Sequence, residues 1–137
     1  MIERAGETAF DYDLHGAGRP ARIQWHFHGR SGLPVAVQSW TLPPGGSEGM
    51  HAHDTDEPLE ELYVVVEGSA AMHVDGVEHD LAPGDAVLAP VGSDHDLRNA
   101  GAGPLRVLVV WGPPGEADWS AYGTAAAATA ARERRGT

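Results

Sequence analysis

The sequence contains neither cysteine nor lysine among its 137 residues, and nine arginines supply all of its cationic side chains. The absence of cysteine excludes disulfides, thiolate nucleophiles and cysteine-ligated zinc sites. The absence of lysine excludes Schiff-base chemistry and a lysine general base. Any chemistry of this chain therefore depends on histidine, aspartate, glutamate, tyrosine or a bound metal ion.

A basic surface and long apolar runs are also missing. The formal net charge is −11 and the pI is near 4.9, whereas nucleic acids and anionic membranes bind basic surfaces, so neither is expected as a partner. No stretch approaches the apolar length of a membrane helix, and the charged segment 1–10 lacks the apolar core of a signal peptide. We therefore expect a cytoplasmic protein, and arginine in place of lysine suits a GC-rich bacterial genome.

Short apolar runs bounded by glycine, proline or aspartate recur along the chain without helical periodicity. Strands of this length with frequent turns predict an all-β fold, an antiparallel sandwich or barrel. The Asp75–Gly76 pair predicts a tight hairpin turn, because glycine supplies the positive φ that such a turn needs. The predicted strands cover residues 9–14, 21–27, 35–42, 61–68, 69–74, 77–81, 85–90 and 105–111.

The length predicts a single barrel with a prefix and a tail. Residues 35–115 form the barrel, and residues 116–137, rich in alanine, form a short helix or a disordered tail. Residues 1–34 hold two strands that form an edge hairpin or lie against a second subunit. Because exposed sheet edges are normally covered, we predict a homodimer with this segment as the cover.

Two histidines stand one residue apart, at positions 51 and 53, and acidic residues follow them. On a strand, His51 and His53 share one face, and two neutral imidazoles on one face suit a bound cation. The segment is either a solvated acidic turn that contains histidine or half of a metal site. The acidic residues are Asp54, Asp56, Glu57, Glu60 and Glu61.

Two segments of the chain resemble the two conserved motifs of the cupin superfamily. The first runs from Gly45 to Gly68 and the second from Gly84 to Asn99. Every spacing of the second motif is present, and the two together indicate a small single-domain, metal-binding cupin. The matching residues are Gly45, His51, His53, Glu61 and Gly68 in the first motif, and Gly84, Pro90, Gly92, His95 and Asn99 in the second.

The first motif departs from the family at one point. Seven residues separate His53 from Glu61, where cupins usually have three or four. Glu57 keeps the family's distance from His53 but precedes Pro58, where the backbone is least strand-like. Glu61 keeps the six-residue spacing to Gly68 and begins a strand. We therefore predict Glu61 as the ligand and Glu57 as the alternative, with residues 54–58 as an acidic insertion that influences the metal without binding it.

The resemblance implies a conical β-barrel of two antiparallel sheets with a metal ion inside it. The ligands it implies are His51, His53, Glu61 and His95. Three imidazoles and one carboxylate suit a divalent Fe, Zn, Mn, Ni or Cu ion and do not discriminate among these. Four protein ligands in an octahedral sphere leave two positions open, which is typical of a catalytic metal site.

Two further residues are candidates for catalysis. Tyr63 shares the face of Glu61 and would line the cavity. On a strand, His79 points to the same face as Val77 and Leu81. It is therefore either an acid or base inside the barrel or a structural histidine.

The resemblance leaves two classes of function open. One is a metal-dependent enzyme that acts on an enolisable or aromatic metabolite, by dioxygenation or by Lewis-acid cyclisation like that of small polyketide cyclases. The alternative is a non-enzymatic, metal-dependent binding or sensor cupin. Because only Arg98 and Arg106 lie in the barrel segment, we expect an uncharged or phenolic small molecule as substrate.

Overall fold

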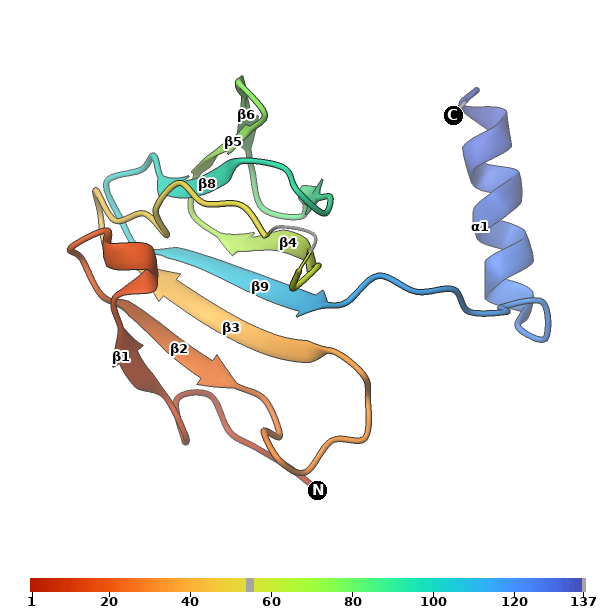
Figure 1. Ribbon diagram of the computed structural model, residues 1–137, viewed down its shortest axis with the longest axis horizontal. Coiled ribbons are helices and arrows are strands. Elements are labelled where there is room, and N and C mark those ends of the chain that lie inside the picture. The colour runs from red at the N-terminus through yellow and green to blue at the C-terminus, as the bar shows by residue number, and fades with distance from the viewer. Residues whose placement is uncertain (54–55, 137) are drawn as a thin grey trace.

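The computed structural model describes residues 1–53 and 56–136, and it consists of two antiparallel sheets that face each other (Figure 1). This arrangement confirms the predicted all-β fold. In spatial order, the six-stranded sheet contains β1 (Phe10–Tyr12), β2 (Ala21–Trp25), β3 (Ala36–Leu42), β9 (Leu105–Gly112), β4 (Glu60–Glu67) and β7 (Ala86–Ala89). The smaller sheet contains β6 (Val77–Leu81), β5 (Ala70–Val74) and β8 (His95–Asn99).

Each of the eight predicted strands corresponds to an observed strand, and β8 is an additional one. Its side chains alternate, with His95, Leu97 and Asn99 buried and the intervening Asp96 and Arg98 more exposed. The period of two is therefore present in the sequence. It is concealed there because two of the three buried side chains are polar.

The core lies between the two sheets and is made of apolar side chains from their inner faces. Burying each large apolar side chain stabilises the fold by about 1.5–3 kcal/mol, so the barrel has a source of stability that does not involve a metal ion. The largest fully buried apolar residues are Leu42, Tyr63, Val65, Met72, Leu97, Leu105, Val107 and Val109.

Two turns flank β5, the strand that lies between β6 and β8 in the smaller sheet. Asp75 and Gly76 both have positive φ, +47° and +83°, and close the β5–β6 hairpin as predicted. Gly68, with φ +92°, connects β4 to β5 where a Cβ atom would lie 2.6 Å from the carbonyl oxygen of Pro104. Glycine is therefore required at the position that ends the first motif.

The N-terminal strands extend the larger sheet at β3, so residues 1–34 include an edge hairpin. Between β1 and β2 the chain makes one 3₁₀ turn, η1 (Leu14–Gly16). Leu14 is buried in the core and fixes this turn against the barrel. The turn lies beside the end of the barrel where the two motifs meet (Figure 1).

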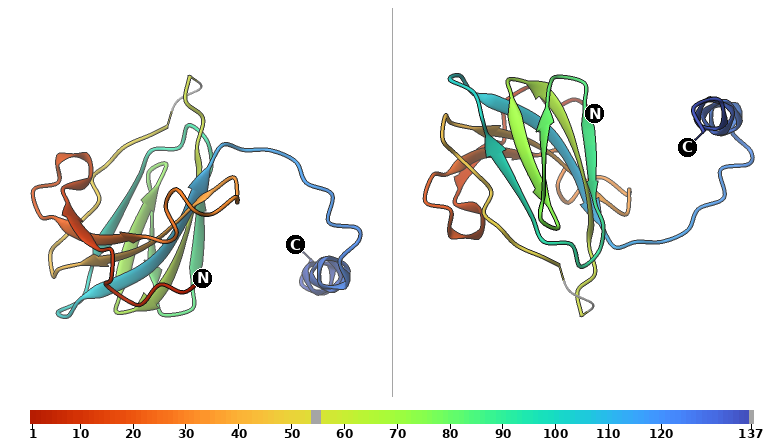
Figure 2. Two further views of the ribbon diagram at one scale, coloured as in Figure 1. Left: turned by 90° about the horizontal axis from the view of Figure 1, so that it is seen from below. Right: turned by 90° about the horizontal axis from the view of Figure 1, so that it is seen from above.

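The C-terminal segment ends in the helix α1 (Gly123–Arg134), which has no buried residue. Figures 1 and 2 show it standing apart from the barrel on an extended connection. Among the described residues, no helix is both long and apolar enough to cross a membrane.

The homodimer remains a prediction. We expect the second subunit to cover the edge of the larger sheet at β1. Phe10 and Tyr12 on this strand are 42% and 57% exposed, and an uncovered strand edge favours pairing with another chain. Sedimentation velocity at micromolar concentration should give the mass of two chains. A single-chain mass for the unmodified protein would contradict the prediction.

Candidate metal centre

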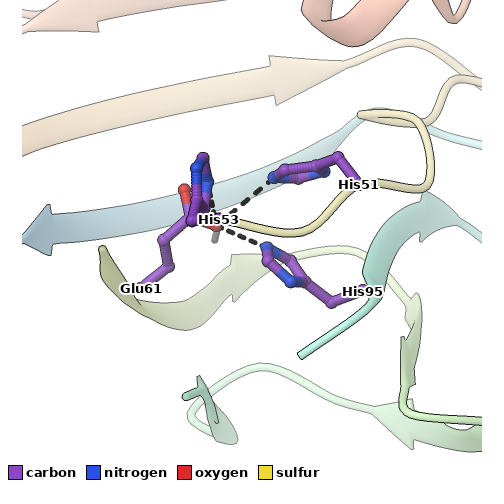
Figure 3. A group of neighbouring side chains, drawn as sticks. All are labelled: His51, His53, Glu61 and His95. Atoms are coloured by element: carbon purple, nitrogen blue, oxygen red, sulfur yellow. Dashed lines mark hydrogen bonds and ion pairs between the residues drawn. The ribbon is translucent and has the colours of Figure 1, made fainter. Parts of the chain in front are cut away.

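The structure brings the four predicted metal ligands together at one end of the barrel (Figure 3). His95 begins β8 and Glu61 lies near the start of β4, in opposite sheets. His51 and His53 belong to the segment between β3 and β4. An isolated antiparallel bridge pairs His51 with His95, whose backbone groups exchange hydrogen bonds of 2.9 and 3.0 Å.

The three imidazoles converge on one oxygen atom of Glu61. The distances from Oε2 of Glu61 to Nε2 are 3.5 Å for His51, 3.4 Å for His53 and 2.5 Å for His95. Donors bound at about 2.1 Å to one ion lie roughly 3.0–3.4 Å apart when adjacent. The cluster therefore has about the dimensions of a coordination sphere.

The hydrogen bonds of the rings decide whether these residues fit a metal ion. Among the described residues, the buried Nε2 atoms of His51 and His53 have no hydrogen-bond partner. Nδ1 of His51 lies 2.8 Å from the carbonyl oxygen of Gly49, and Nδ1 of His95 lies 2.9 Å from that of Ser93. Because a carbonyl only accepts, each Nδ1 donates, and in the neutral ring Nε2 is then the nitrogen with a lone pair for a metal. A metal ion would replace the proton that Nε2 of His95 shares with Glu61 at 2.5 Å. The residues thus fit a divalent cation.

The charges of the cluster also suit a cation. Burial alone would raise the pKa of Glu61, but the imidazoles of His51 and His95 and the hydroxyl of Tyr63 outweigh it and hold that pKa far below its usual value. Burial would lower the pKa of His95, but its contact with Glu61 and its bond to Ser93 raise it. An anionic carboxylate inside a ring of imidazoles is the state that a metal ion stabilises.

A second carboxylate, Glu48, lies behind the cluster and was not predicted. Its side chain is fully buried, Oε2 accepts a 2.9 Å hydrogen bond from the backbone N–H of Leu97, and Oε1 is 3.6 Å from Nε2 of His51. The hydroxyl of Tyr63 lies 2.9 Å from Oε1 of Glu48 and 2.9 Å from Oε2 of Glu61. Nothing in the sequence singles out Glu48. It lies between Ser47 and Gly49 and is not one of the residues that match the first motif.

The bridge through Tyr63 implies a proton on one carboxyl group. A phenol has one hydrogen to donate, so two short contacts to carboxyl groups require that one of these groups donates to the phenol oxygen. Burial and the nearby Glu61 raise the pKa of Glu48 well above its usual value. Glu48 is therefore the protonated member, and Tyr63 donates to Glu61 and holds it in place.

The remaining predicted residues lie away from the cluster or on its margin. His79 is exposed on the edge strand β6, paired with Met72, and belongs to neither donor cluster of the described residues. Its catalytic role remains a prediction that this position does not support. Glu57 is exposed and is not a member of the four-donor cluster, whereas Asp54 lies outside the described residues.

The comparison with known protein families agrees with this arrangement. The cupin domain family matches residues 38–111, which include both histidine segments and more than half of the chain. The chain belongs to the cupin family. The described residues form one cupin barrel, as the sequence motifs predicted.

Two solved cupin structures share the barrel at low sequence identity. A predicted oxalate decarboxylase from Thermotoga maritima superposes with a TM-score of 0.71 at 23% identity, over 83% of this chain and 100% of that chain. A sugar phosphate isomerase from Silicibacter pomeroyi superposes with a TM-score of 0.58 at 24% identity, over 69% and 60% of the two chains. Both show the shared fold.

Curated relatives match part of the cupin. An oxalate-binding protein of Thermotoga maritima is 32% identical over 69 residues, covering 50% of this chain and 54% of the relative. An uncharacterised protein of Methanocaldococcus jannaschii is 29% identical over 83 residues, covering 61% of this chain and 64% of its own length. The matches thus span less than two thirds of these two relatives.

The choice between the competing glutamates can be tested directly. Glu61→Gln should weaken metal binding by about tenfold or more, because an amide oxygen carries no charge and Glu61 is the group on which the imidazoles converge. Glu57→Gln, at an exposed position in the segment before β4, should have a smaller effect. Isothermal titration of both variants with Zn²⁺ checks this order, and a larger effect of Glu57→Gln would reverse the assignment.

Proposed function

We propose that this cupin is a metal-dependent enzyme that acts on a small, uncharged aromatic or enolisable metabolite. The observation that carries the proposal is a cavity of about 380 Å³ that opens onto the candidate metal centre. His53 and Glu61 line it together with five aromatic side chains. Such a volume is within the usual range of small-molecule sites.

The wall of the cavity favours a neutral, flat ligand. The rings of Trp25 and Trp111 meet edge to face with centroids 5.3 Å apart, and aromatic side chains bind planar apolar molecules by such contacts. No arginine contributes to the wall among the described residues. The aromatic residues of the wall are Phe10, Tyr12, Trp25, Trp40 and Trp111.

Gln38 gives the cavity one oriented polar group. The indole N–H of Trp40 donates a 2.8 Å hydrogen bond to Oε1 of Gln38. Because an indole nitrogen only donates, this bond fixes the orientation of the amide and leaves the Nε2 donor for a ligand. A carbonyl or phenol oxygen of the substrate is the group that such a donor would bind.

The protein residues would hold and orient the substrate at the metal end of the cavity. A bound divalent ion would polarise a carbonyl oxygen and stabilise an enolate, and its identity would decide between dioxygenation and redox-neutral cyclisation. Tyr63 is completely buried and contacts Glu61, so its role in this proposal is to hold Glu61 in place, and its predicted catalytic role remains a prediction.

The first test measures what the cavity binds. Trp25, Trp40 and Trp111 line it, so a ligand should quench tryptophan fluorescence of the metal-loaded protein. We expect 2-naphthol to bind at least about tenfold more tightly than oxalate, since the wall has no partner for a dianion beyond the ion itself. Tighter binding of oxalate would contradict the proposal.

The second test measures the metal of the protein purified under native conditions. Elemental analysis that finds iron would favour dioxygen chemistry, whereas zinc would favour cyclisation or isomerisation. Protein without any transition metal, and unable to take one up, would contradict metal-dependent catalysis.

A non-enzymatic binding protein is the second candidate. The relative named an oxalate-binding protein favours this alternative. The two candidates differ in the fate of a ligand that binds, since an enzyme returns it altered and a binding protein returns it unchanged. Mass spectrometry of the ligand after prolonged incubation with metal-loaded protein separates them.

A further inference from the structure

Gln38 is a buried amide on the wall of the cavity, and it is not one of the four candidate metal ligands. Its Oε1 atom accepts the indole N–H of Trp40, and its Nε2 atom has no hydrogen-bond partner among the described residues. Among those residues, the enclosed side-chain polar atoms without a partner are the Nε2 atoms of His51 and His53. Nε2 of Gln38 is therefore not enclosed by protein, and it is open to the cavity that the residue lines.

The register of the larger sheet places Gln38 at a distance from the candidate metal ligands. Trp111 on β9 is paired with Glu61 on β4 and with Ala36 on β3. Gln38 stands two residues beyond Ala36, which makes it a diagonal neighbour of Trp111. Strands about 4.8 Å apart and residues about 3.4 Å apart along a strand put the Cα atoms of Gln38 and Glu61 roughly 12 Å from each other.

Trp111 forms the surface between these two polar groups. Its ring lines the cavity and meets the ring of Trp25 edge to face, and Trp25 is the β2 residue that is paired with Gln38. A planar ligand that lies against Trp111 would therefore reach Glu61 and the metal position with one end and Nε2 of Gln38 with the other.

We infer that Gln38 is a specificity-determining residue, which selects substrates with a hydrogen-bond acceptor at the end far from the metal ion. The inference deepens the proposed function and rests on it, because it concerns a ligand in the same cavity. The substrate class is then a planar molecule with oxygen atoms at two opposite ends, one for the ion and one for Gln38. A ligand with an apolar group at the second end would leave the amide donor unpaired, which costs affinity.

Two naphthols of nearly equal shape test this selection. Both carry a hydroxyl group for the metal end of the cavity. At the opposite end of the ring system, 6-(hydroxymethyl)-2-naphthol carries an oxygen atom where 6-ethyl-2-naphthol carries a methyl group. Isothermal titration of the Zn²⁺-loaded protein should show that the hydroxymethyl compound binds at least about fivefold more tightly, since it gives the buried donor its partner.

Gln38→Met removes the donor and keeps a side chain of similar length. This variant should lose the preference for the hydroxymethyl compound and should bind the ethyl compound at least as tightly as the unmodified protein does. Gln24→Met is the matched control, since Gln24 is a buried glutamine on β2 that bonds to Arg4 and Gly6 and does not line the cavity. It should keep the fivefold preference. Circular dichroism verifies that each variant is folded.

The outcomes separate the failure of this inference from the failure of the proposed function. If both naphthols bind and the unmodified protein prefers the ethyl compound, the aromatic site stands and Gln38 does not select the substrate. The same holds if Gln38→Met keeps the preference for the hydroxymethyl compound. If neither naphthol binds, the proposed substrate class fails and the role of Gln38 fails with it. The preference of the unmodified protein decides the matter even if Gln38→Met does not fold.

Discussion

Replacing His53 with alanine is expected to remove the metal ion from the protein while the barrel stays folded. Its Nε2 atom is buried without a hydrogen-bond partner among the described residues, so metal binding is the interaction that gives this atom a partner. Loss of a group that merely supports a ligand costs 10–100-fold in affinity, and loss of a ligand should cost at least about 100-fold. His51→Ala and His95→Ala should behave in the same way.

Metal content per chain and thermal unfolding measure the two parts of this prediction. The fold should survive because the core consists of apolar side chains between the sheets, such as Met72, Leu97 and Val109. His79→Ala is the matched control, since it removes an exposed imidazole from β6 and should leave the metal content unchanged. Cooperative unfolding of all three ligand variants would instead identify the ion as structural.

The sequence allowed the four residues of the candidate metal centre to be predicted because motif spacing is a local property. His51 and His53 are one residue apart, and His95 has fixed distances from Gly84 and Asn99. The choice of Glu61 needed one physical argument beyond spacing, the start of a strand, and β4 begins at Glu60. These residues could be found without knowing which strands pair.

Glu48 and His15 could not be predicted as neighbours of the metal centre, because they reach it through contacts across the fold. Glu48 acquires its partners from β4 and β8 through Tyr63 and Leu97. His15 reaches His51 only because Leu14 fixes η1 against the barrel. In the sequence, both residues stand in glycine-rich segments that predict solvated turns.

The second prediction concerns the proton that we assign to Glu48 in the metal-free protein. The pKa of Glu48 lies well above 4.5 in the folded state and near this value in the unfolded state. Between these two pKa values the folded protein holds one proton more than the unfolded chain. Its free energy of unfolding should therefore fall as the pH rises, by up to about 1.4 kcal/mol per pH unit.

Other groups of the cluster act in different pH ranges. Glu61 has a lowered pKa, so its contribution is present above the ordinary value of 4.5 and is lost as the pH falls below it. His95 has a raised pKa, so its contribution is present below 6.5 and is lost as the pH rises above that value. Within the interval between pH 4.5 and 6.5, burial lowers the pKa of His15, which opposes the decline, and burial raises the pKa of Asp96, which adds to it. The contribution of Glu48 is therefore the difference between the unmodified protein and a Glu48 variant.

Glu48→Gln is the variant that isolates this proton. The amide can accept from the N–H of Leu97 and donate to the phenol oxygen of Tyr63, which matches the hydrogen bonds of a protonated carboxyl group. The variant should fold with similar stability at pH 4.5 and should decline less steeply than the unmodified metal-free protein toward pH 6.5. Urea unfolding of both proteins in a chelating buffer, repeated across this interval, gives the two slopes. Parallel slopes would mean that Glu48 is ionised when Tyr63 contacts it, and that the proton of the bridge belongs to another group of the cluster.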